Sequence, residues 1–251
     1  MKAPTRTWPE AISFFPTGSS KRQSEARPMM EKALLSYAFV CLLLACPSSA
    51  GEVPNGADNS PMYDTRPESR LQSNIWPDGI GNGLRKNVNE VTFALGPAIG
   101  TRTFGGWQIH DLVLGRLDYA RLRTGVIGGR CPLRGSLEGR LELLGGGQYH
   151  PESTYLFGFT PVLRYNVATG NRWMPFVDVG AGVSLTDIGL PDLCTTFEFN
   201  VQGGAGCSYF LKDNLALTLQ YRFVHISNAD IDSPNVGVNI NVIYIGLSRY
   251  F

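Results

Sequence analysis

The C-terminal stretch decides the fold: NLALTLQYRFVHISN spans residues 214–228, ADIDSPNVG spans 229–237 and VNINVIYIGLSRYF spans 238–251. Successive side chains of an extended strand point to opposite faces. One face of the first segment therefore carries an apolar row that ends in two polar residues: Leu215, Leu217, Leu219, Tyr221, Phe223, His225 and Ser227. In the last segment, Asn239 and Asn241 share the phase of an apolar row, Ile243, Ile245 and Leu247. The pattern predicts a β-hairpin with a histidine, a serine and an asparagine at one end of an apolar surface.

The same alternation recurs upstream, and no segment after Asn87 has convincing helical periodicity. It predicts six further strands, at residues 91–100, around 109–123, and at 137–143, 155–166, 177–185 and 197–209. With the hairpin, the predicted total is eight.

The composition of the two faces indicates which one is inside. The bulky rows contain residues such as Phe157 and Leu163, whereas the polar rows combine Gly, Ala and Ser with charged residues, namely Glu138, Arg140, Glu142, Arg164, Arg222 and Glu198. Small residues and paired charges suit the interior of a narrow barrel, and strands of about ten residues cross a bilayer when tilted. The turns at 168–171 and 212–213 are tight, with longer connections between. We therefore predict an all-β, eight-stranded antiparallel transmembrane β-barrel at residues 88–251; a soluble lipid-binding barrel is the alternative.

Bulk composition sets further limits. The chain is 43% hydrophobic and 17% charged, with a net charge of +1, which fits one domain and no nucleic-acid partner. A mean hydropathy of −0.06 argues against a bundle of membrane helices but not against a barrel. Cys131, Cys194 and Cys207 lack metal-ligand spacing, so we expect no metal site, no cofactor and no disulfide framework, although one Cys194–Cys207 bond is chemically feasible.

Residues 1–50 read as an export region. The segment EKALLSYAFVCLLLACPSSA, residues 31–50, predicts a signal peptide over 29–50 that is cleaved near Ala50. We interpret the residues before Met29 as an artefact of start-site assignment. The alternative is lipoprotein processing at Cys46. Residues 51–87, rich in Pro, Gly, Asn, Asp and Ser, predict a flexible lead-in.

The hairpin motif resembles a known family. His225, Ser227, Asn228 and Ala229, followed by Pro234, Asn235 and Gly237, give HxSNA and then PNxG. This pattern resembles the outer-membrane lipid A 3-O-deacylases and related acyloxyacyl hydrolases. The resemblance implies a serine esterase with Ser227 as nucleophile and His225 as general base. It implies that the substrate is lipid A of lipopolysaccharide in the outer membrane of a Gram-negative-type bacterium. Asn228, Ala229, Asp230, Asn235 and Gly237 would then support the loop and the oxyanion, with Asn235 shaping the loop.

The physical chemistry fits these roles. A serine hydroxyl needs a nearby base, and the base needs a third group that orients its ring. The family's glutamate at that third position is Asn239 here, which can orient the ring but cannot stabilise imidazolium by charge. A family glycine is Asp230 here, whose carboxylate would oppose a developing oxyanion. Asp230 or Asp232 could instead fold back and replace Asn239 as the orienting group.

Other interpretations stay open. A histidine or serine at a strand end is often an interfacial polar residue, so a non-catalytic small barrel with a structural or adhesive role is the alternative function. His110 and His150 show no partner pattern and are expected to be structural. The inward charges are expected to form interior ion pairs rather than a pore, and Cys207 is expected to face lipid. The sequence leaves monomer and homodimer equally open.

Overall fold

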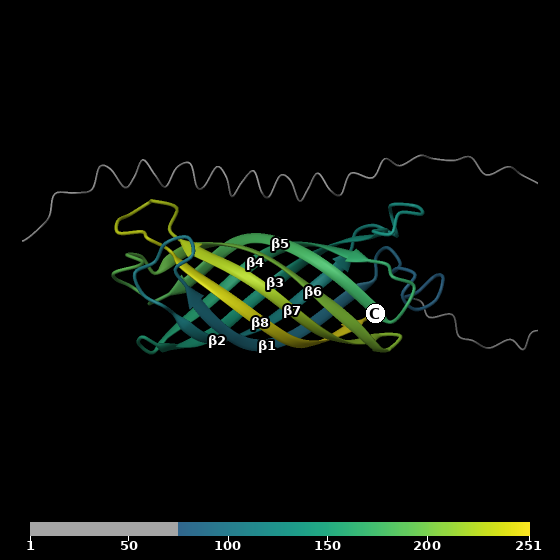
Figure 1. Ribbon diagram of the computed structural model, residues 1–251, viewed down its shortest axis with the longest axis horizontal. Helices are drawn as coiled ribbons and strands as arrows, with labels where there is room; N and C mark the ends of the chain where they lie inside the picture. Colours follow the sequence, from purple (N-terminus) through teal and green to yellow (C-terminus); the bar gives the residue numbers. More distant parts are fainter. Residues whose placement is uncertain (1–74) are drawn as a thin grey trace, which may run out of the picture. The chain divides into compact units, whose positions relative to one another are not determined.

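The computed structural model describes residues 75–251, and these form a closed antiparallel β-barrel (Figure 1). Each strand pairs with its neighbour in sequence, and β1 pairs with β8 to close the barrel. The strands are β1 (Asn89–Thr101), β2 (Asp111–Leu122), β3 (Gly135–His150), β4 (Thr154–Val167), β5 (Trp173–Thr186), β6 (Phe197–Lys212), β7 (Leu215–Ser227) and β8 (Val238–Tyr250). All eight predicted strands are confirmed, and β3 extends well beyond its predicted range. The predicted export region, residues 1–50, and residues 51–74 of the lead-in lie outside the described part of the chain.

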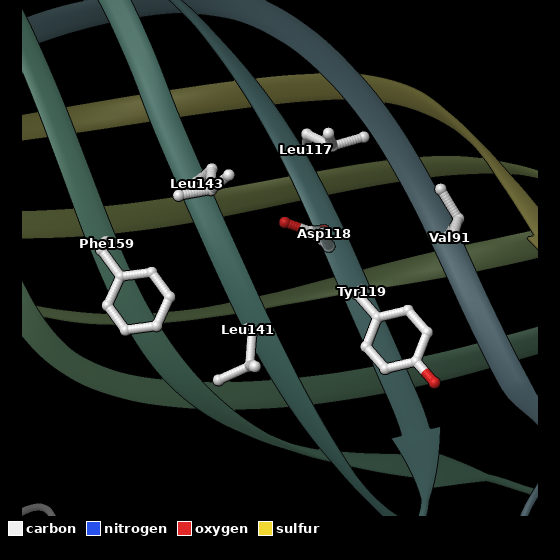
Figure 2. Close-up of a pocket in the computed structure, with 7 residues that line it drawn as sticks. All are labelled: Val91, Leu117, Asp118, Tyr119, Leu141, Leu143 and Phe159. Atoms are coloured by element: carbon white, nitrogen blue, oxygen red, sulfur yellow. The ribbon is translucent and has the colours of Figure 1, made fainter.

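The outer wall of the barrel is apolar. Phe93, Leu143 and Leu219 are more than half exposed, and other large apolar side chains are exposed on every strand. Figure 2 shows part of this wall, a shallow hollow between β1 and β4 lined by Val91, Leu117, Tyr119, Leu141, Leu143 and Phe159. An apolar exterior suits hydrocarbon rather than water, so the soluble alternative with buried apolar rows is wrong. No helix within residues 75–251 is long and apolar enough to span a membrane.

The interior is polar and filled with paired charges. Arg140 lies 2.9 Å from the Asp118 carboxylate and 3.1 Å from that of Glu90, and it also contacts Glu138. Arg164 and Arg222 share the Asp178 carboxylate at 2.8 and 3.0 Å, and Arg222 also binds Glu142. All of these side chains are buried. A buried charge is tolerated only when it is paired and hydrogen-bonded, so the prediction of interior ion pairs is confirmed for these residues. It is wrong for Glu198, which is buried but has no ion-pair partner within residues 75–251; its carboxylate accepts a hydrogen bond from Thr195 Oγ1 at 2.6 Å.

The two ends of the barrel differ. The loops at 102–110, 151–153, 187–196 and 228–237 meet at one end, which we call the site end. The connections at 123–134, 168–172 and 213–214 lie at the other, the terminal end. The expected distribution of tight turns therefore needs correction. The β2–β3 connection at the terminal end is long and includes an isolated β-bridge from Ile127 to Gly135, while the β3–β4 connection at the site end is tight.

The described part of the predicted lead-in is packed rather than free. Ile75, Trp76, Leu84 and Val88 are buried against apolar residues of the terminal end, among them Phe210 and Tyr250. The Trp76 indole Nε1 donates a hydrogen bond to the Asp213 carbonyl at 2.9 Å, and its ring meets Phe210 edge-on at 4.6 Å. Residues 75–88 thus close this end of the barrel, an arrangement that their loop-like composition does not indicate.

Candidate active site

His225 and Asn239 lie opposite each other on β7 and β8, at the site end of the barrel. Both are in the outward phase, yet His225 is half-buried and Asn239 is only 2% exposed. His225 Nδ1 lies 2.8 Å from Asn239 Oδ1, and Asn239 Nδ2 donates to the Gly105 carbonyl at 3.4 Å. Because a carbonyl can only accept, this contact favours the amide orientation in which Asn239 Oδ1 faces His225 Nδ1. In the tautomer that donates from Nδ1 to Asn239, His225 Nε2 is the nitrogen that can act as a base.

Gly237 packs directly against the His225 ring. A Cβ atom at this position would stand 2.9 Å from His225 Cε1, and the backbone φ is +84°. Only glycine meets both demands without strain. The PNxG part of the motif therefore has a steric reason: its glycine leaves room for the imidazole.

Ser227 is the last residue of β7 and shares the outward phase of His225. Its cross-strand neighbour is Phe199, and that of His225 is Val201, both on β6. Within residues 75–251, no hydrogen bond joins the Ser227 hydroxyl to His225. The strand phase thus puts the predicted nucleophile and base on one wall, and the wall around them is apolar.

The loop after Ser227 is held by its own amide side chains. Asn228 is buried and donates from Nδ2 to the Asp232 carbonyl at 3.0 Å and to Cys194 Sγ at 3.2 Å. Asn235 Oδ1 accepts from the Asn228 backbone N–H at 3.0 Å, and Asn235 Nδ2 donates to Asp230 Oδ1 at 3.1 Å. Asn228 and Asn235 therefore shape the loop. Cys194 and Cys207 are thiols rather than a disulfide.

Two further residues of the loop, Ala229 and Asp230, have left-handed backbones with φ of 56° and 62°. Both residues are exposed, and within residues 75–251 neither backbone N–H donates a hydrogen bond. Among the described residues, neither the Asp230 nor the Asp232 carboxylate contacts His225. Asp230 binds Asn235, and Asp232 accepts from the Ser233 backbone N–H at 2.8 Å. The geometry thus favours Asn239 over either aspartate as the partner of His225.

The β1–β2 loop contacts the site, and no sequence motif indicated this. Phe104 packs edge-on against Phe223 of β7 with ring centroids 5.5 Å apart, and the Gly105 carbonyl binds Asn239. Phe104 and Trp107 remain more than half exposed. An apolar rim therefore extends from the barrel wall onto this loop.

His110 shows no partner pattern in the sequence and was expected to be structural; the structure gives it two partners. The ring is buried, with Nε2 2.9 Å from Asp192 Oδ2 and Nδ1 2.9 Å from Gln148 Oε1. These partners come from the β5–β6 loop and from β3, so nothing in the local sequence connects them. His150 is largely exposed, with Nδ1 3.2 Å from the Ile109 carbonyl. Within residues 75–251, no group of histidine, cysteine, aspartate or glutamate side chains is arranged to hold a metal ion.

The fold and the site together define an outer-membrane β-barrel that carries a serine, a histidine and an asparagine on its lipid-facing wall. The family model described as lipid A 3-O-deacylase (PagL) matches residues 120–248. The chain therefore belongs to this family, and the predicted family, fold and outer-membrane location are confirmed.

Solved structures with similar folds include two bacterial barrels. The outer-membrane enzyme PagL is 21% identical with a TM-score of 0.47, over 62% of this chain and 97% of that one. Neisserial surface protein A is 14% identical with a TM-score of 0.50, over 65% of this chain and 97% of that one. No curated protein sequence matches the chain significantly.

Proposed function

We propose that this protein is a serine esterase that removes an ester-linked acyl chain from lipid A in the outer membrane. The observation that carries the proposal is the His225–Asn239 hydrogen bond, two residues from Ser227, in a chain of the lipid A 3-O-deacylase family. Ser227 is the nucleophile, His225 the general base and Asn239 the residue that orients the imidazole.

The reaction follows from the hydrogen bond between His225 and Asn239. As Ser227 Oγ attacks the ester carbonyl, its proton passes to His225 Nε2, because Nδ1 donates to Asn239. The tetrahedral intermediate collapses when the C–O bond to the sugar breaks, and His225 gives the proton to the leaving sugar oxygen. Water, deprotonated by His225, then attacks the acyl-enzyme; the C–Oγ bond breaks, the fatty acid leaves and His225 returns the proton to Ser227 Oγ. The backbone N–H groups of Ala229 and Asp230, which donate to no acceptor within residues 75–251, are the candidate donors to the oxyanion.

The position of the site suits a lipid substrate. An ester of lipid A lies where the headgroup meets the hydrocarbon, with its acyl chains along the barrel wall. Ser227 stands at the end of a strand, beside the exposed apolar residues Phe199 and Val201 of that wall. Polar residues in this phase would be costly against lipid without a functional reason. Outer-membrane barrels have short periplasmic turns and longer outer loops. The shortest connection, 213–214, lies at the terminal end, so the site end would reach the outer leaflet.

Two departures from the family pattern affect the rate rather than the fold. Asn239 supplies an oxygen for orientation but no charge for the imidazolium. The Asp230 carboxylate accepts a hydrogen bond from Asn235 Nδ2 at 3.1 Å, but its negative charge stays beside the proposed oxyanion donors and would oppose the developing oxyanion. Both features are compatible with a slower enzyme.

Mass spectrometry of lipid A tests the function directly. Cells that contain the wild-type protein should yield lipid A lacking one ester-linked acyl chain, and the same spectra identify the position cut. Cells with Ser227→Ala should yield unmodified lipid A. The matched control is Ser233→Ala, which removes an exposed hydroxyl from the same loop and should leave deacylation intact. Unmodified lipid A in the presence of the folded wild-type barrel would instead indicate a non-catalytic protein.

A further inference from the structure

Asp192, in the β5–β6 loop, binds two other loops of the site end, the β1–β2 loop and the β7–β8 loop. Its carboxylate accepts hydrogen bonds from the Trp107 backbone N–H, the Gln108 backbone N–H at 3.0 Å and His110 Nε2 at 2.9 Å. Its backbone carbonyl accepts from the backbone N–H groups of Val236 at 3.0 Å and Gly237 at 3.3 Å. The residue is completely buried. The Asp192 carboxylate thus binds the β1–β2 loop, and the Asp192 backbone carbonyl binds the β7–β8 loop.

Both of these loops touch the His225–Asn239 pair. The β1–β2 loop supplies the Gly105 carbonyl that fixes the Asn239 amide, and the β7–β8 loop supplies Gly237, which limits the position of the His225 ring. Asp192 contacts neither member of the pair. It acts on them only through the backbone segments that it holds.

His110 links the Asp192 carboxylate to β3. Gln148 Nε2 donates to the Glu152 carbonyl at 2.9 Å, which leaves Gln148 Oε1 facing His110 Nδ1. The two ring nitrogens of His110 thus face oxygen atoms of Asp192 and Gln148, at 2.9 Å each, and the ring anchors the Asp192 carboxylate to the barrel wall.

We infer that Asp192 is a positioning residue, which clamps the β1–β2 and β7–β8 loops against the His225–Asn239 pair and so keeps His225 in the tautomer that can deprotonate Ser227. The inference rests on the proposed function for its catalytic meaning, but the positioning itself can be measured without turnover. The neutral amide introduced by Asp192→Asn would offer one oxygen and an NH₂ group to three donors, so at least one loop contact would be lost.

Nitrogen NMR of the full-length barrel in detergent micelles, labelled with ¹⁵N at histidine, measures the tautomers directly. The chain has 3 histidines, of which exposed His150 is an internal reference. For the neutral ring of His225, the wild-type spectrum should show the proton on Nδ1. Asp192→Asn should convert neutral His225 to a mixture of the two tautomers. An unchanged His225 signal in Asp192→Asn would overturn the inference.

Kinetics on lipid A separate positioning from a general loss of structure. Asp192→Asn should lower kcat on the order of 10²-fold, the effect of a small misplacement of a catalytic group, with little change in KM. In an Asn239→Ala background the same substitution should add little, because the contact that it protects is already absent. Fully additive effects, or a rise in KM alone, would contradict the inference.

Asp187→Asn is the matched control, since it neutralises an exposed aspartate of the same loop whose carboxylate accepts from Thr196 Oγ1 at 3.3 Å. It should leave the His225 signals and kcat unchanged, and a loss equal to that of Asp192→Asn would overturn the inference. If the wild type proves inactive on lipid A, the proposed function fails, while the NMR comparison still decides the role of Asp192.

Discussion

His225 Nδ1 lies 2.8 Å from Asn239 Oδ1, directly across the β7–β8 pair. The two residues meet because antiparallel register places them opposite each other on one face, at the distance that suits a side-chain pair. An amide at this position holds the ring as a carboxylate would, but it adds no charge. The orientation of the base is therefore set by the register of β7 and β8 in the barrel wall.

Ser227→Ala and His225→Ala should each abolish deacylation while the barrel stays folded. Loss of a nucleophile or base removes most of the catalysed rate, on the order of 10³-fold or more. Truncation of half-buried side chains at a strand end should cost little stability. Release of fatty acid from lipid A measures the rate, and heat-modifiable migration in gel electrophoresis measures folding. Full activity of Ser227→Ala would refute the assignment of the nucleophile.

Asn239→Ala should lower the rate by roughly 10²-fold, less than Ser227→Ala. The general base His225 would still be present, but its ring would no longer be oriented by a partner. Asn239→Glu should match or exceed the wild type, since a carboxylate also stabilises the imidazolium that forms during attack. Turnover of lipid A by purified protein compares the two variants. A glutamate variant as slow as the alanine variant would show that charge at this position does not help.

Asp230→Asn and Asp232→Asn should retain most of the wild-type rate. Both carboxylates are engaged within the loop, by Asn235 and by the Ser233 backbone N–H, and neither contacts His225. The same lipid A assay applies. If one of these variants were inactive while Asn239→Ala was silent, the orienting group would be the aspartate, and Asn239 would have no part in the reaction.

Gly237→Ala should reduce the rate at least as much as Asn239→Ala, because the new Cβ would stand 2.9 Å from His225 Cε1 and displace the ring. Gly129→Ala is the control for backbone strain alone: its φ is also positive, at +53°, but no atom lies within 4 Å of the added Cβ. Equal activity of the two variants in the lipid A assay would exclude a steric role for Gly237.

Arg140→Met should destabilise the barrel by about 3–5 kcal/mol, since it leaves the buried carboxylates of Glu90, Asp118 and Glu138 without their shared cation. Urea titration, followed by gel mobility without heating, measures the change. Arg130→Met, an exposed arginine of the β2–β3 connection, should have little effect. Equal stability of both variants would show that the interior ion pairs contribute nothing net.

The sequence by itself determined the number of strands, the face that each strand turns outward and the phase of the site. These follow from a period of two that is read residue by residue, as in the row from Leu215 to Ser227, so no distant contact is needed. The pairing of His225 with Asn239 was also accessible, because a hairpin brings nearby residues into register. The HxSNA and PNxG motifs identified the family for the same local reason.

Only the tertiary structure decided which loops complete the site. Asp192 reaches His110, Trp107 and Gly237 across long sequence separations, and Gly105 reaches Asn239 from the first hairpin. The packing of Trp76 under the terminal end is of the same kind. Such contacts depend on barrel closure, which brings β1 beside β8 and sets all four loops of the site end around one ring. Loop residues have no period, so their partners are fixed by where the strands end in space rather than by any local pattern.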